Sequence, residues 1–201
     1  MKKVADAVDV PLIVWGTANH DKDTEVLREV AELCQDKSLI LGPVEEADHK
    51  KIGAAAIGYK HTVVAATPID INLAKQLNIL LGNLGVQDNM LLMDLTVSSI
   101  GYGIEYCFSV MERMRMAALT QQDTKLQFPI ICNLAKEVWK TKEAKISAQD
   151  DPKMGDAKKR GILLEAMSAM ILLLAGADVI IMRHPEAIKL AREMIAELTA
   201  K

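Results

Sequence analysis

The sequence predicts an α/β protein built on a parallel sheet, from three observations. Six short β-branched or aliphatic runs each end in polar, Gly- or Pro-containing residues, and each is followed by a segment of helical periodicity. Hydrophobic residues make up 50 % of the 201 residues and aromatic residues only 3 %, as in α/β cores filled by Ala, Leu, Ile, Val and Met. Because a closed (β/α) barrel has eight such units, the run of six predicts an incomplete barrel. Functional residues are expected at the C-terminal ends of the strands.

The chain is expected to form one domain over residues 1–201. The six predicted strands are Val10–Gly16, Leu39–Gly42, Thr62–Thr67, Met90–Asp94, Pro129–Asn133 and Val179–His184.

The first helical segments follow from apolar spacing and capping residues. Apolar residues in Met1–Val8 predict the last turns of a helix that leads into the first strand. After that strand, Asp23 or Thr24 is placed to cap the N-terminus of a helix. The apolar positions of this helix are Val26, Leu27, Val30 and Leu33.

Later helices are bounded by Pro, Gly and acidic residues. Pro43 followed by Glu45 and Glu46 predicts a helix N-terminus directly after the second strand. A helix is expected over Ile71–Leu84, with Gly85 as its C-terminal stop.

The second half contains the least regular segments. A polar loop around Gly101–Gly103 opens a long helix that runs through Leu119. Residues 134–161 form a long polar connection, rich in lysine, and such a length favours a functional loop or lid. A helix over Glu186–Leu198 follows the last strand.

Charge and cysteine usage exclude several classes of function. The net charge of −3 carries no large basic patch, which disfavours nucleic-acid binding. Cys34, Cys107 and Cys132 are far apart and odd in number, so neither a disulfide framework nor a structural zinc site is indicated, and a cytoplasmic location is expected. The apolar stretch 162–182 contains Glu165 and a Gly-containing break, which predicts no membrane span. No secretory signal is expected at the first residues.

The segment Gly101-Tyr102-Gly103 is similar to the start of a dinucleotide-binding fingerprint, but Tyr106 stands where the third glycine is required. What remains is a Gly-rich approach to a helix N-terminus, which can present N–H groups to a phosphate, a carboxylate or an amide carbonyl. A tight turn without a ligand is an equal alternative.

Acids and histidines near the strand ends supply further candidates. Each of the acids can serve a ligand or cap a helix: Asp70, Asp94 and Glu105. His20 and His184 follow strands, and with Asn19 and Arg183 they are placed to face a ligand. No adjacent nucleophile accompanies them, so the residues alone predict a site for a small, flat or anionic ligand and leave the reaction open.

Four segments carry a family resemblance: Thr67–Asn78, Gly101–Arg115, Glu137–Lys145 and Leu173–Pro185. In order along the chain, these segments resemble the small subunit of the corrinoid iron–sulfur protein. The archaeal counterpart of that subunit is the delta subunit of the acetyl-CoA decarbonylase/synthase complex. The resemblance extends from about Val10 to about Met194.

This resemblance implies a TIM-type (β/α)8 barrel, here with about six units, whose first two units are expected to lie outside the chain. It implies a heterodimer with a large subunit that carries an iron–sulfur cluster, and a cobalt corrinoid of the cobalamin type held between the two subunits. The complex would pass a methyl group from a methyl-tetrahydropterin, through a methyltransferase, to acetyl-CoA synthase in the reductive acetyl-CoA (Wood–Ljungdahl) pathway. The alternatives are a stand-alone pterin-dependent methyltransferase and an inactive barrel fragment.

By position in the resembling motifs, nine residues are expected to contact the corrinoid without covalent catalysis, because the cobalt performs the chemistry. They are Thr17, Asn19, Asp70, Asn72, Thr96, Ser98, Gly101, Tyr102 and Asn133. No residue of this chain is expected to ligate a metal.

Two loops depart from the family pattern. Where the family has Gly-Gly-Ser-Gly-Asn, this chain has Trp15-Gly16-Thr17-Ala18-Asn19, so an indole and an extra methyl group occupy the loop. Where the family has Asp-Pro-Thr-Thr, this chain has Asp94-Leu95-Thr96-Val97, and the Pro-fixed geometry and one hydroxyl are lost.

Overall fold

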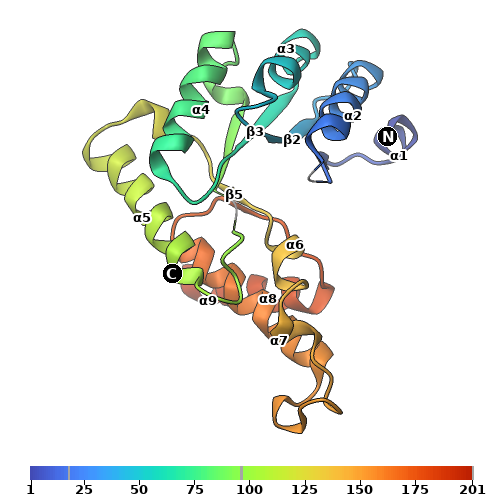
Figure 1. Cartoon of the computed structure of the whole chain (residues 1–201), viewed down its shortest axis with the longest axis vertical. Coiled ribbons are helices and arrows are strands. Elements are labelled where there is room, and N and C mark those ends of the chain that lie inside the picture. Colours follow the sequence, from blue (N-terminus) through green and yellow to red (C-terminus); the bar gives the residue numbers. More distant parts are fainter. Residues whose placement is uncertain (18, 96, 201) are drawn as a thin grey trace. The chain divides into compact units, whose positions relative to one another are not determined.

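The computed structural model describes residues 1–17, 19–95 and 97–200 (Figure 1). They divide into two compact units. Unit 1 consists of Met1–Asp94 with Met116–Pro129, and unit 2 consists of Leu95–Arg115 with Ile130–Lys201. Of the nine predicted corrinoid contacts, Thr96 lies outside the described residues, as does Ala18 of the first loop.

The helices, strands and short 3-10 turns follow one another in the βα order that the sequence predicts. They are α1 (Lys2–Ala7), β1 (Ile13–Trp15), α2 (His20–Leu33), β2 (Ile40–Val44), α3 (His49–Tyr59), β3 (Thr62–Ala66), α4 (Ile71–Leu84), η1 (Asp88–Met90), β4 (Leu91–Asp94), α5 (Ile104–Thr120), η2 (Thr124–Leu126), β5 (Ile131–Cys132), α6 (Leu134–Val138), α7 (Lys142–Lys145), η3 (Pro152–Met154), α8 (Ala157–Leu174), β6 (Val179–Ile180) and α9 (Pro185–Thr199).

Unit 1 is built on a parallel sheet with strand order β1-β2-β3-β4. Ile13 pairs with Ile40, Ile40 with Thr62 and Val63 with Leu91. Helices α2, α3 and α4 lie side by side along this sheet (Figure 1). Since every strand runs in the same direction, the loops after β1, β2 and β3 leave the same edge of the sheet.

The core of unit 1 lies between this sheet and its helices. Large apolar side chains there are less than 2 % exposed, and burying each contributes about 1.5–3 kcal/mol. They include Leu27, Leu41, Ile52, Val63, Val64, Leu81 and Met93. Aliphatic side chains therefore fill the core of unit 1, as the low content of aromatic residues predicts.

Two boundaries predicted near the first strands are wrong. The N-cap of α2 is Asn19, whose side chain accepts from Lys22 N, and Asp23 lies inside the first turn. Strand β2 continues through Pro43 to Val44, and α3 begins only at His49. Because Pro43 has no N–H to donate, the pairing of β2 with β3 shifts between Leu41 and Val44 and the strand continues past the proline.

Unit 2 contains the parallel pair β5 and β6, in which Ile131 pairs with Val179 and Cys132 with Ile180. The Asp178 carboxylate accepts from Ile130 N at 2.7 Å and also pairs with the Arg115 guanidinium, which aligns the start of both strands. Helix α8 packs against α6, α7 and α9.

The long connection predicted over 134–161 is partly helical. It contains α6, α7 and η3, and α8 begins at Ala157. The Arg160 guanidinium donates to the carbonyl oxygens of Glu143, Ile146, Met154 and Gly155. One side chain therefore fastens several turns of the connection to the first part of α8, in the way that arginine with its five donors is suited to do.

All three cysteines are buried; Cys34 belongs to unit 1, and Cys107 and Cys132 belong to unit 2. In the described part of the chain, no helix has the length and apolar character needed to cross a membrane.

Gly42 tests the packing of the sheet. A Cβ atom at Gly42 would lie 2.7 Å from Val64 Cβ on the adjacent strand. We expect Gly42→Ala to lower the free energy of unfolding by about 1–3 kcal/mol, because β2 and β3 must separate to admit the methyl group. Urea unfolding followed by circular dichroism measures this.

Gly58→Ala is the matched control, since nothing lies within 4 Å of a Cβ atom at this position of α3. It should leave stability unchanged or raise it by up to about 1 kcal/mol through helix propensity. Equal effects of the two substitutions would contradict the close approach at Gly42.

Candidate functional site

The loop after β1 is organised by a carboxylate that the sequence analysis assigned to helix capping. Asp23 Oδ1 accepts from Thr17 N and Thr17 Oγ1, both at 2.9 Å, and Asp23 Oδ2 accepts from Asn19 N at 3.0 Å. The Asp23 side chain is buried, while Thr17 and Asn19 are exposed. Asp23 thus fixes both predicted contact residues of this loop from one turn into α2.

Beside this loop lie His20, which the sequence places to face a ligand, and two acids that were not predicted as site residues, Glu45 and Asp48. His20 Nε2 lies 3.7 Å from Glu45 Oε2, and His20 Nδ1 lies 4.0 Å from Asp48 Oδ2. The His20 side chain is 58 % exposed, whereas that of Asp48 is 7 % exposed. His20 is the first residue of α2, and Glu45 and Asp48 lie in the loop after β2, so this edge of the sheet carries more polar groups than the motifs indicate.

Burial raises the pKa of the Asp48 carboxyl above its ordinary value of 3.8. The hydrogen bond from Glu45 N, 2.8 Å from Asp48 Oδ1, and the nearby His20 act in the opposite direction and lower the pKa. The sequence shows Asp48 only as an acid shortly before a helix. An acid at this position is also typical of a helix N-cap, so the pattern does not distinguish a site residue from a cap.

Asp70 caps α4, so of the two predicted roles, ligand contact and helix capping, the structure shows the capping role. Asp70 Oδ1 accepts from Asn72 N at 2.7 Å and from Leu73 N at 3.1 Å. Asn72 is exposed in the first turn of the helix. Strand β2 separates this loop from that of Thr17, so the two loops leave strands that lie about 10 Å apart in the sheet.

The loop after β4 is largely turned inward. Leu95 and Val97, the two apolar departures from the family pattern, are 1 % and 2 % exposed. The replaced positions therefore contribute to the core, while Ser98 between buried neighbours is exposed.

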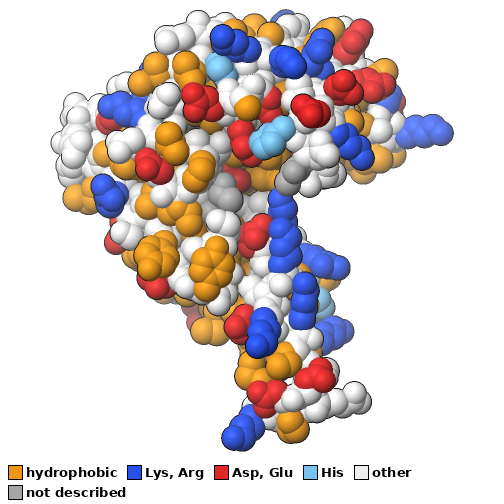
Figure 2. Space-filling model, viewed as in Figure 1, with side chains coloured by type: hydrophobic (Ala, Val, Ile, Leu, Met, Phe, Trp, Pro, Cys, Tyr) orange, Lys and Arg blue, Asp and Glu red, His pale blue; other side chains and the backbone are white. Residues whose placement is uncertain are grey.

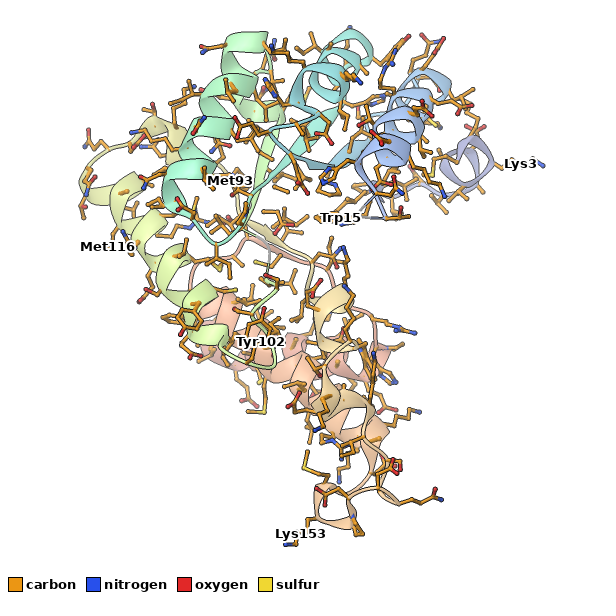
Figure 3. The ribbon with its side chains drawn as sticks, viewed as in Figure 1. Lys3, Trp15, Met93, Tyr102, Met116 and Lys153 are labelled. Atoms are coloured by element: carbon orange, nitrogen blue, oxygen red, sulfur yellow. The ribbon has the colours of Figure 1, made fainter. Side chains whose placement is uncertain are left out.

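Gly101 and Tyr102 lie in unit 2, at the approach to α5. Gly101 has φ of +99°, and a Cβ atom there would lie 2.9 Å from Thr141 Cγ2, so glycine is required on both counts. Tyr102 is 77 % exposed (Figure 3). Behind it, Ser99 Oγ and Cys107 Sγ lie 2.9 Å apart in the interior and join the loop to α5.

Asn133 follows β5 and caps the short helix α6, with its side chain accepting from Lys136 N at 3.3 Å. Trp15, the bulky departure of the first loop, is half-buried in β1 opposite Gly42 (Figure 3).

The structure thus groups the predicted contacts by unit. Thr17, Asn19, Asp70 and Asn72 belong to unit 1, and Ser98, Gly101, Tyr102 and Asn133 belong to unit 2. Asn19, Asp70 and Asn133 all cap helices, which uses one acceptor atom of each. Across the described ranges, no group of three or more His, Cys, Asp or Glu residues is arranged to hold a metal ion.

Parallel βα units with polar loops at the carboxyl ends define a protein of the TIM-barrel class. Two solved structures share the fold: dihydropteroate synthase from Clostridium difficile, determined with pteroic acid, and the Yersinia pestis dihydropteroate synthase with a pterine-sulfa conjugate. The first has a TM-score of 0.59 at 16 % identity, over all of this chain and 72 % of that chain. The second has a TM-score of 0.60 at 13 % identity, over 99 % and 73 %.

Residues 1–198 match the family model of the CO dehydrogenase/acetyl-CoA synthase delta subunit. The chain belongs to this family, which confirms the resemblance found in its motifs. It is 37 % identical over 194 residues to the acetyl-CoA decarbonylase/synthase complex subunit delta of Methanopyrus kandleri, and 34 % identical over 206 residues to that of Archaeoglobus fulgidus.

The chain covers 47 % and 45 % of those two relatives, and they cover 96 % and 100 % of it. It therefore spans about half the length of the relatives that it matches. The members of this family that it matches are subunits of a larger complex, as their names state.

The role of Asp23 is testable through the amide protons that it binds. We expect Asp23→Ala to accelerate hydrogen exchange at Thr17 and Asn19, because both amides lose their acceptor, and to lower the free energy of unfolding by about 1–3 kcal/mol. Exchange measured by NMR resolves the two amides.

Asp21→Ala is the control, since Asp21 lies in the same helical turn and is exposed. Unchanged exchange at Thr17 and Asn19 in Asp23→Ala would contradict the assignment of this carboxylate as the organiser of the loop.

Asp48 gives a pH-dependent prediction. Because the pKa of Asp48 is raised in the folded state, the folded chain holds this proton to a higher pH than the unfolded chain, and ionisation at higher pH costs stability. We expect Asp48→Asn to raise the free energy of unfolding at pH 7, with the gain shrinking as the pH falls toward 3.8. Urea unfolding at both pH values measures it.

The exposed Asp21→Asn serves as the control and should show no such gain. A gain in the free energy of unfolding from Asp48→Asn that grew on acidification would contradict a raised pKa of Asp48.

Proposed function

We propose that this chain is a corrinoid-binding part of a delta subunit, in a complex that passes a methyl group from a methyl-tetrahydropterin to acetyl-CoA synthase. Its partner in the proposal is a large subunit that carries the iron–sulfur cluster and the corrinoid domain. Membership of the delta-subunit family over residues 1–198 is the observation that carries the proposal.

The strand-end loops support a binding role with exposed, uncharged hydrogen-bonding groups. Thr17 Oγ1 donates to Asp23 and keeps its lone pairs for a ligand donor. Asn72 offers an exposed amide, and Tyr102 offers a ring and a hydroxyl. These groups fit a broad ring whose edge carries amide side chains.

The cavities found in unit 1 lie away from these loops. One of about 820 Å³ is lined by α2 and α3, and one of about 280 Å³ is lined by residues that precede β3 and β4, among them His61 and Met90. A ligand at the carboxyl ends would therefore use neither of these two cavities.

When bound, a cobalt corrinoid supplies the methyl-carrying chemistry itself. In unit 1, the residues that would then bind and orient such a ring are Thr17 and Asn72, and in unit 2, taken by itself, the corresponding residue is Tyr102. Asp23, Asp70 and Asn133 would hold the loops in shape, since each accepts hydrogen bonds from backbone amides.

Association with a corrinoid-loaded large subunit tests the proposal. We expect the chain to co-elute with that subunit in size-exclusion chromatography and to alter the corrinoid absorption band. Tyr102→Ala should weaken the association by about tenfold, because an exposed aromatic side chain at an interface typically contributes more than 1 kcal/mol.

Tyr59→Ala is the control, since Tyr59 ends α3 and precedes β3, at the opposite end of that strand. A full-length delta subunit serves as the positive control. If the full-length subunit associated and this chain did not, the proposal would be wrong for this chain.

The alternative of a pterin-dependent methyltransferase is favoured by one finding, the shared fold with synthases solved in the presence of pterin compounds. Calorimetric titration of the isolated chain with methyltetrahydrofolate separates the two functions. Tight binding without the large subunit would support the alternative.

A further inference from the structure

A cluster at the carboxyl end of β6 has no part in the proposed corrinoid surface. We define the β6 cluster as Trp139, Glu165, Arg183 and His184, all within unit 2. Glu165 is 0 % exposed, and its carboxylate accepts hydrogen bonds from Trp139 Nε1 at 3.0 Å, from Arg183 N and from His184 N at 3.1 Å.

Glu165 explains how two consecutive side chains are held in place. Burying a carboxylate is costly unless its oxygens are satisfied, and here three donors satisfy them. The same bonds fix the backbone of Arg183 and His184 and the plane of the Trp139 indole. The buried acid of α8 thus positions groups that lie at the surface.

The cationic side chain of the cluster rests on an aromatic face. Arg183 Cζ lies 5.7 Å from the centre of the Trp139 ring, in cation–π contact, and Arg183 is exposed. This contact uses the face of the guanidinium. The N–H groups along the edge of the guanidinium can therefore donate to other acceptors. Within the described ranges, these N–H groups have no carboxylate or carbonyl partner.

His184 adds a donor of defined direction. Its ring stacks on Trp139 with centroids 5.9 Å apart and an interplanar angle of 27°. His184 Nδ1 accepts from Glu186 N at 3.2 Å, so in the neutral ring the proton is on Nε2, which becomes a donor. His184 is also the N-cap of α9, and the 15-residue helix adds partial positive charge at this point.

The segment 134–145, which contains Trp139, carries four lysines and two glutamates. Lys and Arg side chains gather over α6 and α7 (Figure 2). Glu186, in the first turn of α9, opposes this charge, but the described structure contains no ion pair between Glu186 and Arg183.

We propose that Arg183 and His184 form an oxyanion-binding site that takes a phosphate ester or a carboxylate group of a ligand. The guanidinium edge matches the paired oxygens of either group, and the His184 Nε2–H supplies a further donor. The site stands independently of the corrinoid proposal, because none of its residues is among the proposed corrinoid contacts.

Fluorescence of Trp139 tests the proposal without any corrinoid or partner. The chain has two tryptophans, so Trp15→Phe leaves Trp139 as the single indole. We expect a saturable change in Trp139 emission on titration with inorganic phosphate or with acetate, at constant ionic strength kept with chloride. Arg183→Gln should weaken the binding by at least about tenfold, and Arg183→Lys by less, because lysine keeps the charge without the paired donors.

Arg192→Gln, at an exposed position of α9, is the matched control and should bind as the parent chain does. Shifts of the His184 amide signal in NMR give a second readout that does not depend on the indole. Saturation by phosphate at lower concentration than by acetate identifies a phosphate ester as the ligand group, and the reverse order identifies a carboxylate. No saturation by either anion, or equal binding by Arg183→Gln and Arg192→Gln, would overturn the proposal.

Discussion

The parallel pairing of the strands is the constraint on which the rest of the structure depends. Within each of the two sheets it sends the chain from a strand into a segment that leaves the carboxyl edge of that sheet, and each helix begins with backbone N–H groups that lack intrahelical partners. Asp23, Asp70 and Asn133 accept hydrogen bonds from these or adjacent loop amides. Glu165 performs the same task after β6, although it comes from the middle of α8. The acids and amides after the strands of each unit therefore serve the fold first.

This use of acceptors shapes what the edge offers a ligand. A carboxylate that accepts two or three backbone hydrogen bonds is held in one orientation and is poorly suited to move protons during a reaction. The accessible groups include a hydroxyl, an amide and the His20 imidazole in unit 1, and an aromatic ring, a guanidinium and an imidazole in unit 2. Such groups are suited to binding and orienting a ligand, and the chain belongs to the family of a subunit of a larger complex.

The sequence predicted what depends on local pattern and missed what depends on distant contacts. All six strands and the helix Ile71–Leu84 with its Gly85 stop follow from short-range periodicity and capping residues, and the structure confirms them. The family and the fold class are confirmed as well. The assignment of Asp23 as an N-cap failed because its carboxylate reaches backward to Thr17, and β2 passed through Pro43 because a register shift absorbs the missing donor. No local pattern links Glu165 to Arg183 and His184, because these partners lie 18 and 19 positions further along the chain.

The three buried thiols give the two units separate chemical labels. A thiol that is 0–1 % exposed cannot meet an alkylating reagent until its surroundings open, so its modification rate reports the opening equilibrium of the region around it. Cys34 would report on unit 1, and Cys107 and Cys132 on unit 2. Mass spectrometry of the alkylated peptides would then show whether the halves of this chain open together or one at a time, with no engineered probe.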